Sequence, residues 1–193
     1  MILRIEDTDQ NRFVKGAEEY IMESLAWCGI KFDEGVNEGG PYAPYRQSDR
    51  KSIYRDYAMQ LVESGNAYYA FDSPEELESM RLRLESAKAL NTSYNPASRM
   101  GMKNSLTLDA HTTEDIIRSV DPFVIRFKTP ENDDIDFTDI IRGEMHVKSA
   151  TLDDKVLFKS DGMPTYHLAN VVDDRLMKIT HVIRGEEWLP SLA

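Results

Sequence analysis

The sequence of 193 residues contains one cysteine, Cys28, and four scattered histidines. A single cysteine excludes an intrachain disulfide and a cysteine-based zinc site, and the histidines do not show the spacing of metal ligands. We find no apolar run long enough to cross a membrane and no signal peptide, so a membrane is not an expected partner. These absences favour a reducing, cytoplasmic compartment.

An excess of basic residues is also lacking, since 34 acidic residues face 23 basic ones and the net charge is −11. This balance argues against one continuous basic surface but leaves room for local patches. Near the start of a predicted helix, basic residues cluster at Arg46, Arg50, Lys51 and Arg55. They are either a solvated helix face or contacts for phosphates, and their conflict with the helix dipole mildly favours a functional reason.

The first residues predict a strand over 2–5, followed by acidic side chains at its carboxyl end. Glu6 ends the strand directly, on the side of a sheet where ligands bind. Asp7 and Asp9 are interpreted as turn and capping residues. The alternative is a metal site formed with Glu6, as in a metal-dependent hydrolase. Apolar residues at helical spacing then predict a helix over 17–28.

The segment from Pro164 onward predicts a helix capped by Thr165 and then a strand over 179–183. Tyr166 and Asn170 lie four residues apart, so a helix places them on one face. Arg184 follows the strand, where a guanidinium suits a carboxylate or a phosphate. Alternatively, Arg184 forms a surface ion pair, Tyr166 lies in the core and Asn170 is a cap.

Between these segments the pattern predicts a small α+β unit. A loop over 35–44 precedes a helix that starts at Ser48 or Asp49 and ends near Gly65. A second helix starts with a capping box at Ser73, and its apolar stripe contains Leu77, Met80 and Leu84. A short helix is expected over 113–120. The predicted strands cover residues 67–71, 123–128, 135–137, 144–148 and 156–158.

Several of these stretches resemble the bacterial glutamyl-tRNA synthetases: LRIEDTD at 3–9, GAEE at 16–19, GP at 40–41, PYRQS at 44–48, KSDGMPTYHLANVVDD at 159–174 and VIRGEEW at 182–188. The match runs over nearly the whole chain in the family's order. Glutaminyl enzymes and other glutamyl enzymes typically have Asp-Asp-Thr-Asn where this chain has Glu-Asp-Thr-Asp at 6–9, which favours the bacterial glutamyl type.

The resemblance implies an α/β fold: part of a Rossmann-type class I catalytic domain, in pieces 1–47 and 165–193, with an inserted α+β domain over 48–164 that holds the acceptor end of tRNA. It implies that Glu6 holds the ammonium group of glutamate, that Arg184 pairs with its side-chain carboxylate, and that Tyr166 and Asn170 line the pocket. Glu187 and Trp188 would lie near ATP, and Asp9 and Arg12 near the tRNA acceptor end.

The implied reaction joins L-glutamate to tRNA(Glu), with ATP and Mg²⁺ and without zinc, in a monomeric enzyme. The family's two nucleotide-binding motifs and its anticodon-binding region do not occur in the sequence. We therefore expect a fragment that is incomplete for catalysis. The alternative for the isolated chain is a catalytically inactive module that binds the tRNA acceptor end.

Overall fold

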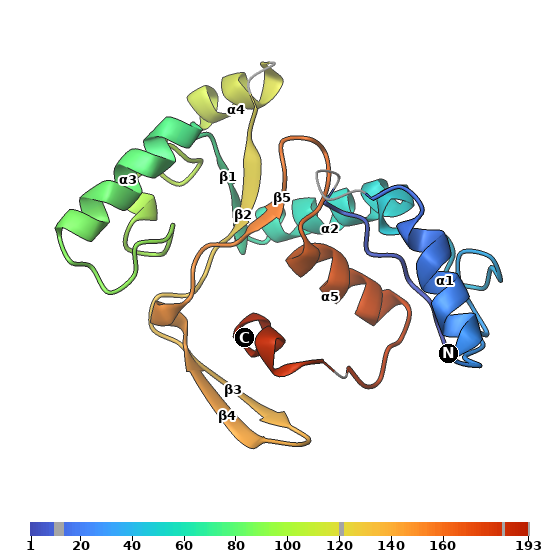
Figure 1. Ribbon diagram of the computed structural model, residues 1–193. Helices are drawn as coiled ribbons and strands as arrows, with labels where there is room; N and C mark the ends of the chain where they lie inside the picture. The colour runs from blue at the N-terminus through green and yellow to red at the C-terminus, as the bar shows by residue number, and fades with distance from the viewer. Residues whose placement is uncertain (10–13, 120–121, 183, 193) are drawn as a thin grey trace.

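The computed structural model describes residues 1–9, 14–119, 122–182 and 184–192. Its centre is a three-stranded antiparallel sheet in the order β1-β2-β5, formed by Ala67–Ala70, Val124–Phe127 and Val156–Phe158 (Figure 1). Ala67 pairs with Phe127, and Ile125 pairs with Phe158, next to an irregularity in the register. The strands predicted over 67–71, 123–128 and 156–158 are therefore confirmed to within a residue or two.

Two helices cover one face of this sheet and form the larger core with it. They are α2 (Lys51–Glu63) and α5 (Tyr166–Leu176), which contact each other and the sheet. Tyr54 and Ala58 of α2 are one turn apart and fully buried, as spacing by four residues requires. The buried residues of this core are Tyr54, Ala58, Ala67, Ile125, Leu157, Leu168, Ala169 and Val172.

The opposite face of β1 packs against α3 (Pro74–Ser86). Side chains alternate along a strand, so Ala67 faces the larger core while Tyr68 and Ala70 face a smaller one with Met80 and Tyr94. The predicted capping box is confirmed, because Ser73 accepts a hydrogen bond from the Glu76 amide and the Glu76 side chain bonds the Ser73 amide. The predicted stripe of α3 packs here, with Leu77 and Leu84 beside Met80.

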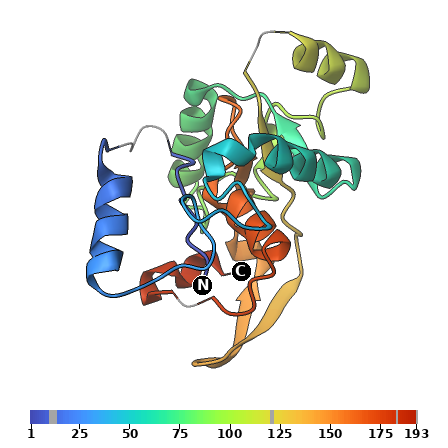
Figure 2. The same cartoon turned by 90° about the vertical axis from the view of Figure 1, so that its right-hand side faces the viewer.

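Beyond this sheet lie a hairpin and short helices. The strands β3 (Asp134–Asp139) and β4 (Gly143–Lys148) form a two-stranded antiparallel ribbon that extends away from the sheet (Figures 1 and 2). α4 (Ala110–Arg118) starts three residues earlier than predicted, because Asp109 caps it. The short 3₁₀ helices are η2 (Gln47–Arg50), η3 (Arg99–Gly101), η4 (Ser149–Thr151) and η5 (Glu186–Ser191).

The strands predicted over 2–5 and 179–183 do not form among the described residues. Residues 2–5 are extended but make only isolated parallel bridges, Ile2 with Glu34 and Ile5 with Arg46. At the other segment Ile179 and Val182 remain exposed, and residue 183 lies outside the described part. An apolar run becomes a strand only when a neighbouring strand pairs with it. The parallel sheet of the Rossmann prediction is therefore not formed by the described residues.

Two predicted helix starts need correction. The turn η2 precedes α2, and neither Ser48 nor Asp49 caps the helix, because the N-cap residue is Arg50. Thr165 does occupy the N-cap of α5, but its hydroxyl donates to the Val156 carbonyl oxygen instead of accepting from the helix. The predicted helix 17–28 is confirmed as α1 (Ala17–Trp27), which stands at one side of the molecule and has no buried residue (Figure 2).

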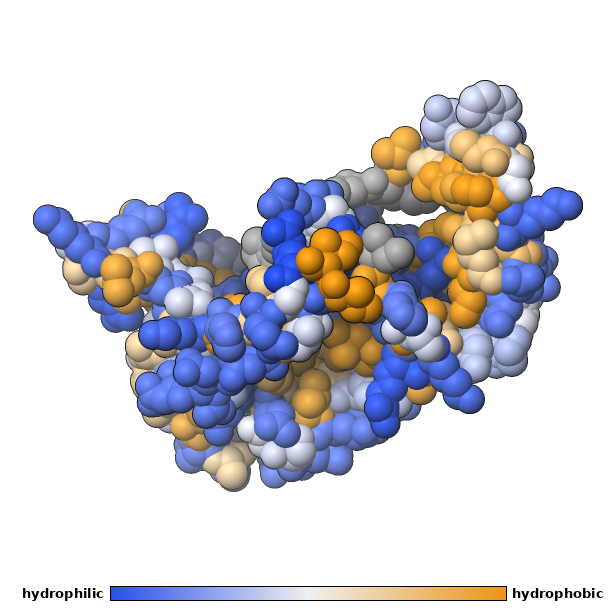
Figure 3. All heavy atoms as spheres, turned by 90° about the horizontal axis from the view of Figure 1, so that it is seen from below, coloured by the Kyte–Doolittle hydropathy of each residue, from blue (hydrophilic) through white to orange (hydrophobic). Residues whose placement is uncertain are grey.

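Large apolar side chains are exposed at several separate places, and Figure 3 shows such patches between charged side chains on the lower face. Trp27 on α1 is 89% exposed, and Ile140 and Ile141 at the hairpin tip are 86% and 89% exposed. No helix in the described part of the chain has the length and apolar character that crossing a bilayer requires.

Candidate functional site

The site is formed where the N-terminal segment meets one face of α5. Residues 4 and 6 are two apart on extended backbone, so Arg4 and Glu6 point to the same side. Arg4 donates to a carboxylate oxygen of Glu6 at 2.9 Å and to a carboxylate oxygen of Asp174 at 2.8 Å. Burial alone would lower the pKa of Arg4, but its bonds with Glu6 and Asp174 outweigh burial and raise that pKa. The guanidinium is therefore charged at neutral pH.

Asn170 connects this arginine with the tyrosine one helical turn away. Its side-chain oxygen accepts a hydrogen bond from Arg4 at 2.5 Å, and its amide nitrogen donates to the Tyr166 hydroxyl at 3.3 Å. The predicted shared face of Tyr166 and Asn170 on α5 is thus present. The hydrogen bonds link Glu6, Arg4, Asn170 and Tyr166 in a continuous chain.

Arg184 and Trp188 complete the group from the other side of Tyr166. The Arg184 guanidinium carbon lies 5.2 Å from the centre of the Tyr166 ring and 5.3 Å from that of Trp188. The two rings are 5.1 Å apart. Burial raises the pKa of Tyr166, the positive charge of Arg184 lowers it and the negative charge of Glu6 raises it, with a net increase. Tyr166 therefore lies between a cation and an anion and keeps its proton at neutral pH.

Behind the site, Asp173 is fully buried and joins three parts of the chain. Its carboxylate accepts from Arg50 at 2.8 Å, from the Tyr54 hydroxyl at 2.7 Å and from the Gln47 amide at 3.0 Å. The nearest Arg4 nitrogen lies 3.8 Å away. A buried carboxylate needs such partners to remain charged. Asp173 consequently fixes α5 to α2 and to the segment that carries Arg4.

This network corrects the prediction of a surface patch at Arg50. The Arg50 side chain is only 3% exposed, and its Nη1 donates to the carbonyl oxygens of Tyr42 and Pro44. A buried guanidinium with bonded donors does not reach a phosphate. Arg46 is half-buried and paired with Glu18 and Asp49. Lys51 and Arg55 are exposed and lie one turn apart on α2, so the exposed patch reduces to these two.

In the acidic turn at 6–9, some residues form hydrogen bonds that hold the fold and others are exposed to solvent. The Asp7 carboxylate accepts from the Ser48 amide at 2.8 Å, and Thr8 is buried with its carbonyl oxygen accepting from Lys159 at 3.1 Å. Asp9 is exposed, and Arg12 lies outside the described residues. Within the described ranges, no group of three or more histidine, cysteine, aspartate and glutamate side chains is arranged to hold a metal.

Of the two residues predicted near ATP, Trp188 packs on the Tyr166 ring and so belongs to the same site. Glu187 is exposed on η5, and its carboxylate folds back over Gly185. A Cβ at position 185 would meet the Glu187 oxygens at 2.3–2.5 Å, so glycine leaves room for this conformation. Trp188 thus contacts Tyr166, whereas the Glu187 carboxylate lies over Gly185.

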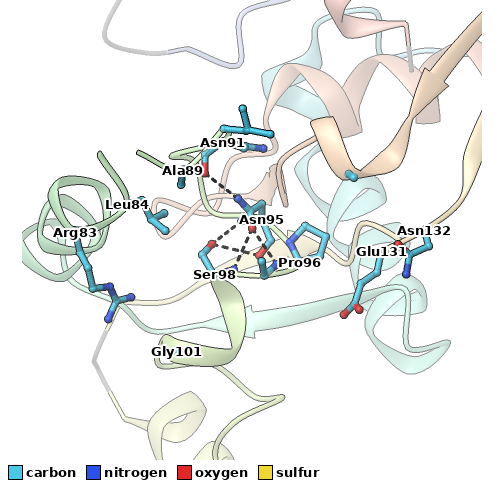
Figure 4. Close-up of a pocket in the computed structure, with 13 residues that line it drawn as sticks. Arg83, Leu84, Ala89, Asn91, Asn95, Pro96, Ser98, Gly101, Glu131 and Asn132 are labelled. Atoms are coloured by element: carbon cyan, nitrogen blue, oxygen red, sulfur yellow. Dashed lines mark hydrogen bonds between the residues drawn. The ribbon is translucent and has the colours of Figure 1, made fainter. Parts of the chain in front are cut away.

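One small cavity borders the site, and a larger one is lined by other residues. One of about 140 Å³ is lined by Arg184, Trp188 and Leu192 together with Ile141 and Arg142 of the hairpin. A larger one of about 500 Å³ lies in the middle of the chain, between the end of α3 and residues 131–132 (Figure 4). There the Asn95 side chain accepts from the Ala97 and Ser98 amides, which fixes the loop that forms its wall. Of the predicted binding residues that the structure describes, none lines this larger cavity.

The family described as class I tRNA synthetases (E and Q), catalytic domain, matches residues 1–193. The chain belongs to this family. It is 64% identical to the glutamate–tRNA ligase of Amoebophilus asiaticus over 190 residues, which are 98% of this chain and 37% of that protein. The corresponding protein of Cytophaga hutchinsonii is 62% identical over 191 residues, which are 99% of this chain and 37% of the relative.

A solved structure agrees with these relatives. The glutamate tRNA ligase from Elizabethkingia meningosepticum, in complex with its amino acid, superposes with a TM-score of 0.93 at 53% identity over 99% of this chain. The chain spans 38% of that structure and 37% of the two curated relatives. The predicted membership of a class I glutamyl-type family is thus confirmed, and the fold is the mixed α/β catalytic domain of class I synthetases.

The sequence interpretation missed Arg4, Asp173 and Asp174. A signal for Asp173 was present, because it adjoins Val172 on the buried face of α5. A buried acidic residue needs a partner, so its position predicts an ion pair or hydrogen bonds. Arg4 is two residues before Glu6, and that spacing on extended backbone predicts a shared face. Asp174 offered no comparable signal.

Proposed function

We propose that this chain is part of a glutamate–tRNA ligase, which activates L-glutamate with ATP and transfers it to the 3′ end of tRNA(Glu). The observation that carries the proposal is the meeting of Glu6, Tyr166, Asn170 and Arg184 at one site, from segments more than 150 residues apart. The high identity to proteins named glutamate–tRNA ligase supports it.

The charges of the site complement free glutamate. Glu6 offers a carboxylate for the ammonium group, and Arg184 offers a guanidinium for the side-chain carboxylate. Arg4 already neutralises part of the Glu6 charge, but a carboxylate has about four lone-pair positions and keeps some for a ligand. Tyr166 lies close enough to both charges for each to shift its pKa, since Arg184 lowers that pKa and Glu6 raises it. We propose that Tyr166 and Asn170 line the pocket between them.

Rejection of glutamine follows from the chemistry of Arg184. A guanidinium only donates hydrogen bonds, so it pairs with a carboxylate but leaves the amide nitrogen of glutamine facing a donor. In a site closed from water such a mismatch costs several kcal/mol, which corresponds to roughly a 100-fold or larger preference.

The chemical step needs positioning and charge neutralisation rather than a protein nucleophile. The glutamate α-carboxylate attacks the α-phosphate of ATP, which releases pyrophosphate, and the terminal ribose of tRNA then takes the glutamyl group. Mg²⁺ would arrive bound to the ATP phosphates as part of the substrate. We propose that Trp188 borders the ATP side of the pocket and that Glu187 lies on the same side. We further propose a monomer that acts in the cytoplasm, where the exposed thiol of Cys28 remains reduced.

The finer architecture is also proposed. Residues 1–47 and 165–193 would be pieces of a Rossmann-type catalytic domain, and 48–164 an insertion that holds the acceptor end. The make-up of the central sheet supports this division, because its strands β1, β2 and β5 all come from residues 48–164. Asp9, Arg12 and the exposed pair Lys51 and Arg55 are the proposed contacts to tRNA.

Glutamate-dependent ATP–pyrophosphate exchange in the full-length protein that contains this chain, with tRNA(Glu) present, tests the activity. In Arg184→Ala the KM for glutamate should rise roughly 100-fold, because two charge-assisted hydrogen bonds are lost. The control is Arg118→Ala, which changes an exposed arginine on α4 that pairs with Glu114 in the same helix. An unchanged KM in Arg184→Ala would remove this residue from the pocket.

Binding of tRNA to the isolated chain separates the enzyme from a binding module. If the isolated chain binds tRNA but itself catalyses no exchange, the inactive module is the correct description of that chain. Replacing Lys51 and Arg55 by alanine should lower the salt dependence of binding by a slope of about 0.7–0.9 per lost phosphate contact. Arg50→Ala is unsuitable for this test because Arg50 is buried.

A further inference from the structure

The hydrogen bonds of the site have a fixed direction that begins at Arg4. A guanidinium donates and never accepts, so the Asn170 atom that faces it must be the carbonyl oxygen. The other end of that amide is then a nitrogen, which donates to the Tyr166 oxygen. Arg184, which can only donate, is a second hydrogen-bond partner of this hydroxyl. Because the Tyr166 oxygen accepts from both, its own proton remains to be donated to a ligand.

Arg4 is held firmly enough to set this direction. Its side chain is 12% exposed and forms ion pairs with Glu6 at 2.9 Å and Asp174 at 2.8 Å. The backbone on both sides is fixed too, since the Leu3 amide bonds the Glu34 carbonyl and the Ile5 amide bonds the Tyr45 carbonyl, each at 2.9 Å. Carboxylates on two sides and fixed backbone leave the guanidinium little freedom to turn.

We propose that Arg4 is a positioning residue that makes the pocket select a carboxylate over an amide; this rests on the function proposed above. Arg4 keeps Asn170 in one orientation, and Asn170 keeps the Tyr166 hydroxyl aimed outward as a donor. Tyr166 and Arg184 together then present only donors to the ligand side chain. The same guanidinium holds the Glu6 carboxylate in place for the ammonium group.

Without Arg4 the direction is no longer fixed. The Asn170 amide can turn over and offer its oxygen to Tyr166, whose hydroxyl then donates inward. Arg184 would still bond the Tyr166 oxygen, but the lone pair released by Asn170 would be available as an acceptor, which suits the amide nitrogen of glutamine. Loss of Arg4 therefore weakens selection in a way that loss of a merely structural residue would not.

The experiment measures kcat/KM for glutamate and for glutamine in ATP–pyrophosphate exchange with the full-length protein. In Arg4→Gln, whose amide both donates and accepts, the preference for glutamate should fall roughly tenfold, the size of one charged hydrogen bond. Arg4→Lys only donates and should keep most of the preference. The matched control is Arg81→Gln, an exposed arginine on α3 that pairs with Glu78 and Glu85.

A second pair of variants tests the route through Tyr166. In a Tyr166→Phe background the hydroxyl is absent, so Arg4→Gln should change the preference by less than about twofold, a non-additive result. If Arg4→Gln does not fold, Asp174→Asn loosens the same guanidinium and should lower the preference in the same direction.

The outcomes distinguish the two proposals. If the wild-type protein shows no glutamate-dependent exchange, the proposed function fails and the role of Arg4 fails with it. If exchange occurs and depends on Arg184, but Arg4→Gln keeps the full preference or acts additively with Tyr166→Phe, only the role of Arg4 is overturned.

Discussion

Two buried aspartates each bond one tyrosine and one arginine, but they lie in different parts of the molecule. Asp173 bonds the hydroxyl of Tyr54 and the guanidinium of Arg50, and Asp154 bonds the hydroxyl of Tyr68 and the guanidinium of Arg99. Both carboxylates are fully buried. A charged group inside a protein needs several such partners, and each network supplies them.

The difference lies in what else each network contacts. Asp173 is on α5, three residues after Asn170, and its network reaches Arg4 and hence the candidate pocket. Asp154 accepts from the Thr129 amide, while its own carbonyl oxygen accepts from Arg126, which lies over the Tyr94 ring. All of those residues belong to the middle segment. The same chemistry thus supports a site in one place and fixes an internal fold in the other.

The largest effect is expected from Asp173→Asn. This change leaves the buried Arg50 without its carboxylate and should lower the free energy of unfolding by about 3–5 kcal/mol. Urea-induced unfolding measures the loss. If the proposed activity is correct, the KM for glutamate of the full-length protein should also rise, since Arg4 and Asn170 lose the support behind them. A stable variant with normal KM would separate the network from the pocket.

Asp154→Asn should come next, with a loss of about 2–4 kcal/mol. The loss is smaller because Arg99 keeps an ion pair with Glu131 at 3.3 Å and a bond to the Thr129 carbonyl. For the activity proposed above, the KM for glutamate of the full-length protein should not change, because the bonds of Asp154 among the described residues join residues of the middle segment. A raised KM in this variant would contradict the distinction drawn between the two aspartates.

The sequence predicted the middle of the chain well, because its elements are formed by local chemistry. The capping box at Ser73 and the alternation along β1 act within a few residues, and both are found. The strands expected over 2–5 and 179–183 depend on neighbouring strands, which a pattern of apolar residues does not supply. Element type was therefore predictable where an apolar run finds a pairing strand within this chain, as β1 does with β2, and not where it makes only isolated bridges.

The site shows the same limit. Glu6, Tyr166, Asn170 and Arg184 could be named from residue type and resemblance, and the structure brings them together. The surface patch was wrong at Arg50, because its partner Asp173 is 123 residues away and no local signal marks the pairing. The spacing of Arg4 and Glu6 predicts their shared face, but the bond from Arg4 to Asn170 joins residues 166 apart and has no local signal.

Alkaline pH should weaken both networks together. Burial, followed by the bond to Asp173 or Asp154, raises the pKa of Tyr54 and Tyr68 above the ordinary value of 10.0. Above that value an unfolded tyrosine loses its proton while the folded one keeps it, so stability is complete below pH 10 and falls as pH rises further. The fall should be about 1.4 kcal/mol per pH unit for each tyrosine. Urea titrations between about pH 9 and pH 11 measure it, and Tyr54→Phe should reduce the slope by one proton.

The smallest effects are expected at neutral pH from Tyr54→Phe and Tyr68→Phe. Each removes one hydrogen bond to a carboxylate that keeps an arginine and a further donor, so each should cost about 1–2 kcal/mol. The pair is informative because the two losses should be nearly equal while the glutamate KM responds in one case only. Tyr54→Phe weakens the hold on Asp173 and should raise KM by less than about threefold, whereas Tyr68→Phe should leave it unchanged. Equal KM values in both variants, measured beside equal losses of stability, would show that Asp173 supports the fold and does not influence the pocket.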